Sequence, residues 1–345
     1  MKHTRTIKVG NVIIGPNHPI VIQSMTTTKP KNISETITAI NNLSKIGAEI
    51  VRVAIEDLED AAAISLIKPH INVPIVGDIH FDYKLGIAAI EAGADKIRIN
   101  PGNILDIEGL HAIIEAAKSK NIPIRIGFNS GSISKIVNKK TEVDAILETV
   151  DHYIKMFESW DFYNFCISIK MSDPLLTITA NERCFNKYDY PLHIGLTEAG
   201  DIISGTVRSS YVLGTLISKG IGDTIRVSLT ENPVEEVFAG YEILKSLKLR
   251  QRGVNFVSCP TCGRTQIDLI GLAKKVEARF KNLDKNITIA TMGCVVNGPG
   301  EARHADFGIA GGINEGYVFK KGEIVARVPE SELLDKLEEV INNSL

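Results

Sequence analysis

Apolar and polar positions form a repeating pattern from residue 20 to about residue 246. Each repeat is a short run of β-branched or apolar residues, then a polar loop, then a longer stretch whose apolar positions have helical spacing. Amphipathic helices are predicted between the apolar runs, for example over 34–46, 83–91, 109–119 and 141–157. The runs themselves predict eight strands, over 20–25, 50–55, 74–79, 96–100, 123–128, 165–170, 191–196 and 224–229.

Eight strand and helix alternations over about 225 residues match the size of a (β/α)8 TIM barrel. A doubly wound sheet would usually show a Gly-x-Gly-x-x-Gly turn after its first strand, but residues 23–28 read Gln-Ser-Met-Thr-Thr-Thr. The fold class is therefore predicted as α/β, with a TIM barrel. Before the first barrel strand, two β-prone runs around Gly10-Asn11 predict a small hairpin over 7–14.

The pattern changes near residue 248, where cysteines and Gly-Pro turns replace the strand and helix repeat. Strand-like runs are found only at 255–258, 287–292 and 317–319, and a charged helix is predicted over 329–341. We expect two domains, a barrel with the hairpin over 1–248 and a small α+β domain over 249–345. A domain of that size often needs a metal or another cross-link for stability.

Composition narrows the functional class. Of 345 residues, 44% are hydrophobic and 23% charged, and the formal net charge is −2, which excludes disorder and gives no global positive field for nucleic-acid binding. No signal-peptide run or membrane-length apolar stretch occurs, so a cytoplasmic protein without membrane contact is expected. In such a chain, five cysteines favour metal ligands, redox groups or core packing over disulfides.

Basic residues lie inside the predicted strands. Because side chains alternate along a strand, an arginine between two outward apolar residues should face the barrel interior. Polar residues also stand at or just past several strand ends, where catalytic groups collect in barrels. The basic set is Arg52, Arg98, Arg125 and Arg226, extended by Lys170 and His193, and the strand-end residues are Asp78, Asn100 and Asn129.

Several converging cations are costly unless an anion neutralises them. Arginine's planar fork suits phosphate, and this many cations exceed the need of one carboxylate, so a diphosphate ligand is favoured. Glu198, after the seventh strand, is a candidate for proton transfer at the same mouth. It could instead be a helix N-terminal carboxylate that complements the helix dipole.

The second domain contains a Cys-x-x-Cys at Cys259 and Cys262, and Cys294 follows on a Gly-rich segment. Three thiolates leave a fourth position on a metal centre, for which Glu301 and His304 compete. An iron-sulfur cluster would make this a redox centre, and a Cys3His zinc site would be a structural staple. The spacing favours iron-sulfur over zinc, and Cys166 and Cys184 are interpreted as core residues.

The same residues carry a resemblance to a known family. Nearly the whole chain resembles the 4-hydroxy-3-methylbut-2-enyl diphosphate synthases of the non-mevalonate isoprenoid pathway, in their short bacterial form. The matching motifs begin at Gln23-Ser-Met-Thr26, Gly77-Asp-Ile-His-Phe81, Ile97-Arg-Ile-Asn-Pro-Gly-Asn103, Arg125-Ile-Gly-Phe-Asn-Ser-Gly-Ser132, Ser168-Ile-Lys-Met-Ser-Asp173, Leu192-His-Ile-Gly-Leu-Thr-Glu-Ala-Gly200, Cys259-Pro-Thr-Cys-Gly-Arg264 and Met292-Gly-Cys-Val-Val-Asn-Gly-Pro-Gly-Glu301.

The resemblance implies a reductase that opens the ring of 2-C-methyl-D-erythritol 2,4-cyclodiphosphate with two electrons and loss of water. It implies a 4Fe-4S cluster on Cys259, Cys262, Cys294 and Glu301, ferredoxin or flavodoxin as electron donor, and a homodimer in which each cluster domain caps the partner's barrel. Asp78 and Glu198 match acidic catalytic positions. The substrate-binding positions implied are Arg52, Arg98, Asn100, Arg125, Asn129, Lys170, His193, Arg226 and Ser228.

The residues alone leave two other classes of protein open. One is a zinc-stapled phosphosugar aldolase or isomerase, in which Lys170 forms a Schiff base. The other is a non-catalytic metal-binding regulatory protein with the barrel as a scaffold, which the basic strand interiors disfavour.

Overall fold

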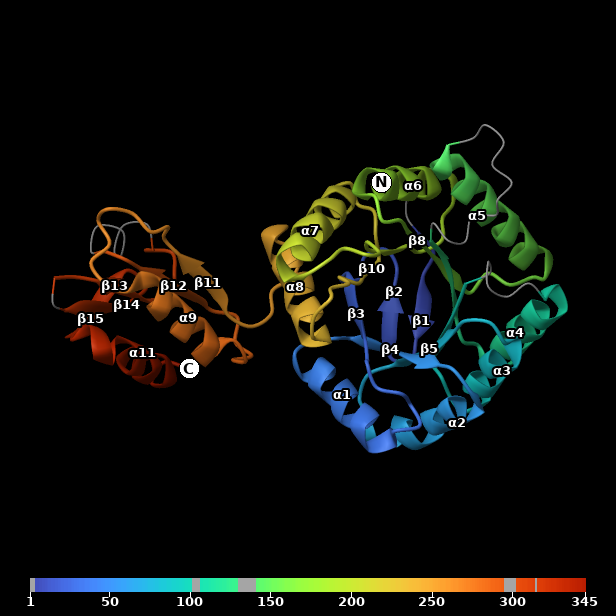
Figure 1. Cartoon of the computed structure of the whole chain (residues 1–345), viewed down its shortest axis with the longest axis horizontal. Helices are drawn as coiled ribbons and strands as arrows, with labels where there is room; N and C mark the ends of the chain where they lie inside the picture. The colour runs from blue at the N-terminus through green and yellow to red at the C-terminus, as the bar shows by residue number, and fades with distance from the viewer. Residues whose placement is uncertain (1–3, 101–105, 130–140, 295–301, 314) are drawn as a thin grey trace. The chain divides into compact units, whose positions relative to one another are not determined.

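The computed structural model describes residues 4–100, 106–129, 141–294, 302–313 and 315–345. The chain divides into two compact units, Met1–Arg250 and Gln251–Leu345, which are considered separately below (Figure 1). None of the helices in the described ranges combines the length and apolar character needed to cross a membrane.

The first unit is a TIM barrel, as the sequence predicts (Figure 1). Its parallel sheet runs in the order β8-β7-β6-β5-β4-β3-β10-β9, and a parallel bridge between Ile167 and Leu192 joins β8 to the residue before β9. The strands are β3 (Val21–Met25), β4 (Ile50–Ile55), β5 (Ile75–Ile79), β6 (Lys96–Ile99), β7 (Ile124–Asn129), β8 (Phe165–Lys170), β9 (His193–Ile194) and β10 (Thr224–Ile225).

Helices surround this sheet, and polar side chains fix where most of them begin. Asp106 accepts hydrogen bonds from the backbone amides of Glu108 and Gly109, and Asp201 accepts one from Ser204, which satisfies amides that have no partner within the helix. The helices are α1 (Ile33–Lys45), α2 (Leu58–Ile67), α3 (Tyr83–Glu91), α4 (Ile107–Lys120), α5 (Glu142–Ser159), α6 (Pro174–Lys187), α7 (Ile202–Ser218) and α8 (Pro233–Ser246), with a short 3-10 helix, η1 (Lys68–His70).

Strand alternation divides the barrel into an apolar outer layer and a polar interior. Val51, Val53 and Ile55 of β4 belong to the large core between sheet and helices, whereas Arg52 between them does not. The same separation holds in β6, where Ile97 and Ile99 join that core. The site is therefore built on strand residues that the helices hold in place from outside.

Two barrel strands are shorter than predicted. The sequence suggested strands over 191–196 and 224–229, but β9 and β10 each end at their second residue. A Cβ atom at Gly195 would lie 2.5 Å from the carbonyl oxygen of Arg226 and 2.7 Å from Lys170 Nζ. At Gly195 the chain passes so close to these atoms that it leaves the regular strand path. Only glycine permits this close approach, because any Cβ atom would collide with them.

The predicted hairpin is present and closes the amino-terminal end of the barrel. Strands β1 (Ile7–Val9) and β2 (Val12–Ile14) pair antiparallel. Their buried side chains pack against Val21, Ile50 and Val76, which lie at the beginnings of their strands, and against Cys166. The hairpin thus fills the end of the barrel opposite the strand carboxyl ends.

The second unit is a five-stranded sheet in the order β11-β12-β13-β14-β15. The sequence predicts three of these strands and misses β13 and β15, as well as helix α9. β13 contains two glycines, and β15 is an exposed edge strand with charged residues, so neither has a strong strand pattern. The elements are β11 (Asn255–Ser258), α9 (Leu269–Phe280), β12 (Thr288–Met292), β13 (Phe307–Gly311), β14 (Gly316–Lys320), β15 (Glu323–Val328), η3 (Glu330–Glu332) and α11 (Leu333–Asn342).

The two faces of this sheet have different cores. Leu272 and Val276 of α9 and Leu337 of α11 share one apolar cluster with Ile289 of β12. Ala290, which follows Ile289 in the same strand, and Met292 belong to a second and smaller cluster. Since neighbouring strand residues face opposite ways, the helices cover one face and the smaller cluster lies on the other.

Candidate functional site

The structure brings the four strand arginines together inside the barrel. Arg52 comes from β4, Arg98 from β6 and Arg125 from β7, and Arg98 lies directly opposite Arg125 in the ladder. Arg125 is 2% exposed, and Arg226 follows β10 by one residue. Gly127 makes this density possible, since a Cβ there would lie 2.8 Å from Arg98 Nε. Such a cluster is stable only with strong compensation from anions.

Asp78 of β5 supplies part of that compensation. Its carboxylate lies 3.1 Å from Arg98 Nη1 and 3.5 Å from Arg52 Nε, and His80 Nε2 is also 3.5 Å away. Burial alone would raise the pKa of Asp78, but Arg52, His80 and Arg98 outweigh it and hold the pKa far below its usual value. Asp78 is therefore an ionised group that orients two arginines, rather than a proton donor.

Arg226 is held by a residue that the sequence analysis does not single out. Glu236 of α8 is 5% exposed, and its carboxylate oxygens lie 3.2 and 3.3 Å from Arg226 Nη2. Nε of Arg226 also donates to Glu236 Oε2 at 3.3 Å. Met25 Sδ lies between two arginines, 2.9 Å from Arg52 Nη2 and 3.7 Å from Arg226 Nη1.

Lys170 and His193 complete the lining beside the arginines. Burial, and then the charges of nearby arginines, lower the pKa of Lys170 well below its usual value. Burial and the surrounding cations likewise keep the pKa of His193 well below its usual value, so the ring is neutral at pH 7. Its Nδ1 lies 2.7 Å from Thr224 Oγ1, which fixes the ring orientation.

The predicted polar residues lie at the strand carboxyl ends. Asn129 ends β7 and pairs in register with Lys170, the last residue of β8. Asn100 directly follows β6 and is 3% exposed. Ser228 follows Arg226 by two residues and is partly exposed. All three lie at the carboxyl-terminal ends of the strands, where barrel enzymes place their reacting groups.

Glu198 is exposed and has an unusual backbone conformation. Its φ is +54°, in the left-handed region that non-glycine residues rarely adopt. Ser172 Oγ donates a hydrogen bond of 2.6 Å to Glu198 Oε2. Helix α7 begins after Asp201, which caps it, so Glu198 lies outside the first turn and the helix-dipole interpretation is wrong. Backbone strain of this kind is often found at functional sites.

A second polar layer lies among these groups and was missed in the sequence analysis. Gln23 Oε1 accepts hydrogen bonds from Arg125 Nη1 at 3.3 Å and Lys96 Nζ at 3.5 Å. Lys96 is fully buried, and burial lowers its pKa to about 8. Lys96 lies two residues before Arg98 in the same strand, and this alternation could have predicted that its side chain faces the barrel interior. The sequence gives no such signal for Glu236, because an acidic residue in a first helical turn is usually a surface residue.

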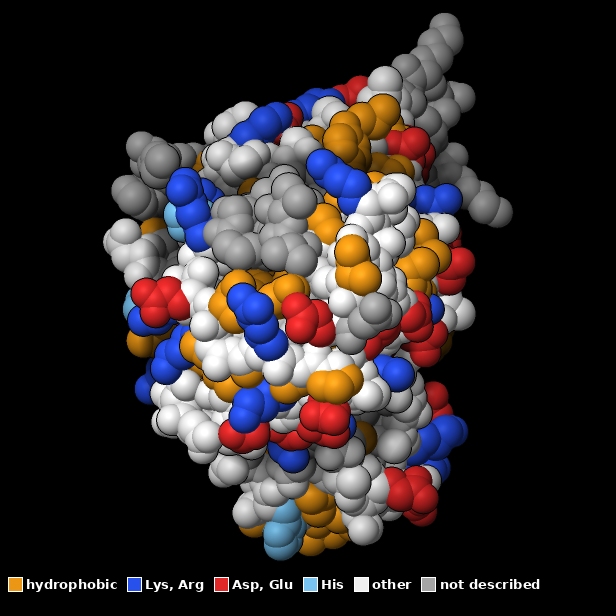
Figure 2. Space-filling model, turned by 90° about the vertical axis from the view of Figure 1, so that its left-hand side faces the viewer, with side chains coloured by type: hydrophobic (Ala, Val, Ile, Leu, Met, Phe, Trp, Pro, Cys, Tyr) orange, Lys and Arg blue, Asp and Glu red, His pale blue; other side chains and the backbone are white. Residues whose placement is uncertain are grey.

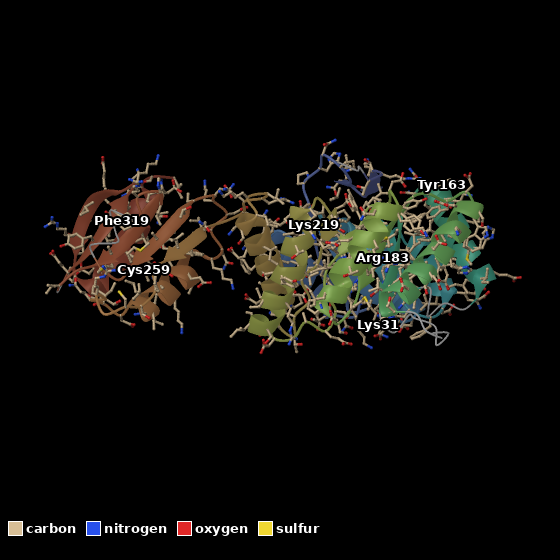
Figure 3. All side chains as sticks on the ribbon, turned by 90° about the horizontal axis from the view of Figure 1, so that it is seen from above. Lys31, Tyr163, Arg183, Lys219, Cys259 and Phe319 are labelled. Carbon is tan, nitrogen blue, oxygen red and sulfur yellow. The ribbon has the colours of Figure 1, made fainter. Side chains whose placement is uncertain are left out.

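The three cysteines of the second unit lie on two segments joined by backbone hydrogen bonds. The Gly293 amide donates to Cys259 Sγ at 3.2 Å, and the Gln266 amide donates to the Gly293 carbonyl at 3.0 Å. Cys259 packs against the small cluster that contains Phe319 (Figure 3). Cys294 is buried and Cys262 is exposed. Cys166 and Cys184, in the barrel, are buried.

The donor chemistry of these segments fits an iron-sulfur cluster. Cysteine thiolates are the usual ligands, and an amide that donates to a ligating sulfur is one way in which proteins tune such clusters. Within the described ranges, no three His, Cys, Asp or Glu residues lie close enough to hold a metal ion. Glu301, the predicted fourth ligand, lies outside the described residues. His304 is exposed, and its Nε2 accepts a hydrogen bond from Arg303 Nε.

The fold and the site define a TIM barrel with basic side chains clustered in its interior, followed by a second, cysteine-bearing domain. Residues 4–241 match the GcpE TIM-barrel domain and residues 255–343 match the GcpE protein C-terminal domain. The chain belongs to the GcpE family.

Curated relatives match over nearly their whole length. The Fusobacterium nucleatum protein named 4-hydroxy-3-methylbut-2-en-1-yl diphosphate synthase (flavodoxin) is 51% identical to this chain, and the alignment covers 100% of this chain and 98% of the relative. The protein of that name from Caldicellulosiruptor saccharolyticus is 54% identical over 97% of each chain. The one from Bacillus subtilis is 50% identical, with 98% of this chain and 91% of the relative covered.

Solved structures support the barrel assignment only. Dihydropteroate synthase from Xanthomonas albilineans in complex with 7,8-dihydropteroate aligns with a TM-score of 0.51 at 11% identity. The alignment covers 71% of this chain and 99% of that one. At this identity the similarity shows a shared fold and nothing about substrate.

Proposed function

We propose that this chain is the oxidoreductase that converts 2-C-methyl-D-erythritol 2,4-cyclodiphosphate to 4-hydroxy-3-methylbut-2-enyl diphosphate. Two electrons and two protons enter and one water leaves, so the ring opens and one hydroxyl is lost. The buried cation cluster of the barrel is the observation that carries this proposal, together with the printed names of relatives that are about half identical. These names include no aldolase, isomerase or regulatory protein.

The charge of the barrel suits the ring-opening step. When the bond between carbon and the bridging phosphate oxygen breaks, that oxygen becomes a terminal phosphate oxygen and its negative charge develops in the transition state. Arg52 and Arg125 are cations inside a site of low dielectric, where fixed charges stabilise such a developing anion strongly. Binding that strengthens as the reaction proceeds raises the rate.

Each predicted site residue then has a role. The arginines and Lys170 bind the diphosphate, with Asn100, Asn129, His193 and Ser228 as neutral hydrogen-bonding partners. Asp78 holds Arg52 and Arg98 in place through its ion pairs. Glu198 is the candidate for proton transfer to the departing hydroxyl, because it is exposed at the strand carboxyl ends and a hydroxyl group already orients its carboxylate.

The second unit is proposed to hold a 4Fe-4S cluster through Cys259, Cys262, Cys294 and Glu301. Such a cluster supplies electrons one at a time at low potential, which a ring-opening reduction requires. We propose flavodoxin or ferredoxin as the donor, with flavodoxin supported by the name of the relatives. The amide of Gly293 would stay hydrogen-bonded to the Cys259 sulfur and stabilise its negative charge.

Metal analysis tests the cluster directly. After anaerobic purification and reconstitution, we expect about four irons and four sulfides per chain, with broad absorption near 400 nm. Replacing Cys294 by serine should remove most of the iron and the absorption. The matched control is Cys184→Ser, which changes a buried barrel cysteine and should leave the metal content unchanged. One tightly bound zinc and no sulfide in the wild-type chain would overturn the cluster proposal.

The remaining proposals concern assembly and environment. We propose a homodimer, a cytoplasmic location, and no nucleic-acid or membrane partner. In Figure 2, lysine and arginine side chains are interspersed with acidic ones on the face that is displayed. An interspersed surface of this kind does not create the extended positive field that attracts nucleic acids.

A further inference from the structure

Glu236 contacts both the guanidinium of Arg226 and the backbone beyond it. Oε1 accepts a hydrogen bond of 3.0 Å from the amide of Leu229, three residues after Arg226. Both oxygens lie within 3.3 Å of Arg226 nitrogens. One carboxylate therefore links α8, the arginine and the segment that contains Ser228.

The contact uses one side of the arginine and leaves the other available. Nε and Nη2 of Arg226 are engaged by Glu236, whereas Nη1 points toward Met25 Sδ at 3.7 Å, beside Arg52. A thioether is a weak acceptor, so Nη1 has no strong partner among the described side chains. An arginine held in this way presents a fixed donor to the barrel interior at little further entropic cost.

We propose that Glu236 is a positioning residue for diphosphate binding, which acts by holding Arg226 and the segment 226–229 in the geometry that the ligand requires. Only the identity of the ligand rests on the proposed function. The alternative role is simple charge neutralisation, in which Glu236 reduces repulsion among the cations without fixing Arg226. The two roles predict opposite effects on anion affinity, because loss of a carboxylate makes the barrel more positive.

The test measures binding of inorganic pyrophosphate by calorimetry, without reductant, so it does not depend on turnover. We expect Glu236→Gln to weaken binding about tenfold, and Arg226→Gln to weaken it by a similar factor. In the double variant the two effects should not multiply, because Glu236 acts through Arg226. Glu242→Gln is the matched control, since Glu242 is exposed on the same helix, and it should change affinity less than twofold.

Unchanged or tighter binding in a folded Glu236→Gln variant would overturn the proposal, and so would fully multiplicative losses in the double variant. If Glu236→Gln fails to fold, Glu236→Asp replaces it. Aspartate keeps the charge but is too short to reach both Arg226 and Leu229, so affinity should still fall, whereas charge neutralisation predicts no change.

A crystal structure of the same variant provides a readout that needs no ligand. We expect the Arg226 guanidinium to leave its position beside Met25, and an undisturbed guanidinium would contradict the proposal. Should wild-type protein fail to bind pyrophosphate, the proposed function would be in error, while this structural comparison would still decide the role of Glu236.

Discussion

At the scale of single residues, the barrel interior is defined by buried charge. Among the described residues, six basic side chains lie on the inner surface: Arg52, Lys96, Arg98, Arg125, Lys170 and Arg226. Asp78 and Glu236 are carboxylates paired with arginines of this set. Burying a cation without a counter-charge is costly, so we expect a bound anion to offset this excess. We therefore expect the ligand-free barrel to be less stable than the barrel with a bound diphosphate.

Asp78 should contribute strongly to stability at neutral pH. Its folded pKa is depressed, so its contribution is complete above the unfolded value, near 4, and is lost as the pH falls through the folded value. We expect Asp78→Asn to lower the free energy of unfolding by about 3 kcal/mol at pH 7 in urea titrations, because two largely buried arginines lose their partner. The control is Glu56→Gln, an exposed partner of Lys29, with an expected loss below about 1 kcal/mol. Equal losses would contradict this account.

Lys96 should make ligand binding depend on pH. Burial lowers its pKa to about 8 in the empty barrel, and a bound anion would raise that pKa, so affinity should fall as the pH increases above about 8. The cyclic diphosphate does not titrate in this range, so proton uptake on binding without reductant belongs to the protein. Calorimetry in buffers of different ionisation enthalpy should show uptake near pH 8.

Variants measure the share of that uptake that belongs to Lys96. Lys96→Met should reduce it, and Lys219→Met, at an exposed lysine (Figure 3), should not. Identical proton uptake in wild type and Lys96→Met would show that Lys96 does not titrate with binding.

At the scale of elements, strand parity accounts for what could be predicted. The alternation in β4, β6 and β7 placed their arginines inward because apolar neighbours mark the outer face. Lys96 follows the same rule and was missed only because it begins its strand. Glu236 could not be predicted, because its function depends on α8 packing beside β10, and no local pattern encodes that contact.

Local sequence patterns also failed to predict some strand boundaries in the barrel and some strands of the second unit. The predicted seventh and eighth strands extend past Ile194 and Ile225, because apolar residues continue beyond both positions. In the structure the strands end there, and the close approach at Gly195 ends the pairing. β13 was missed because glycines replace the branched residues that mark a strand. Tertiary packing forms these elements, rather than local propensity.

The hairpin β1-β2 should stabilise the barrel without affecting the site. Ile14 is 1% exposed in the cluster at the amino-terminal end, and its neighbour Ile13 is 40% exposed. We expect Ile14→Ala to lower the free energy of unfolding by about 3 kcal/mol and Ile13→Ala by less than about 1 kcal/mol. Pyrophosphate affinity should stay within twofold of wild type in both. A large affinity loss in folded Ile14→Ala protein would show that the hairpin shapes the binding site.

At the scale of the whole molecule, one exposed apolar face needs an explanation. Ile203, Val207 and Tyr211 are spaced by four residues on α7, and each is more than half exposed. Residues with that spacing share one side of a helix, and large exposed apolar patches usually mark an interaction surface. In a chain proposed to form homodimers, this face is where we expect the second copy to bind.

Light scattering tests this expectation. Wild-type protein should have about twice the chain mass of 37.7 kDa, and Val207→Glu should shift it toward the single-chain mass, because a buried unpaired charge is costly. The control is Leu66→Glu, an exposed leucine on α2. A dimer that persists in Val207→Glu at micromolar concentration would place the contact elsewhere.

The central claim is that this barrel binds a cyclic diphosphate which is then reduced, and anaerobic turnover tests it most directly. Reconstituted protein is mixed with 2-C-methyl-D-erythritol 2,4-cyclodiphosphate and reduced flavodoxin, and the product is identified by phosphorus NMR and mass spectrometry. We predict 4-hydroxy-3-methylbut-2-enyl diphosphate, with one product formed for every two electrons consumed. Protein with an intact cluster that binds the cyclic diphosphate but leaves it unchanged under reduction would contradict the account.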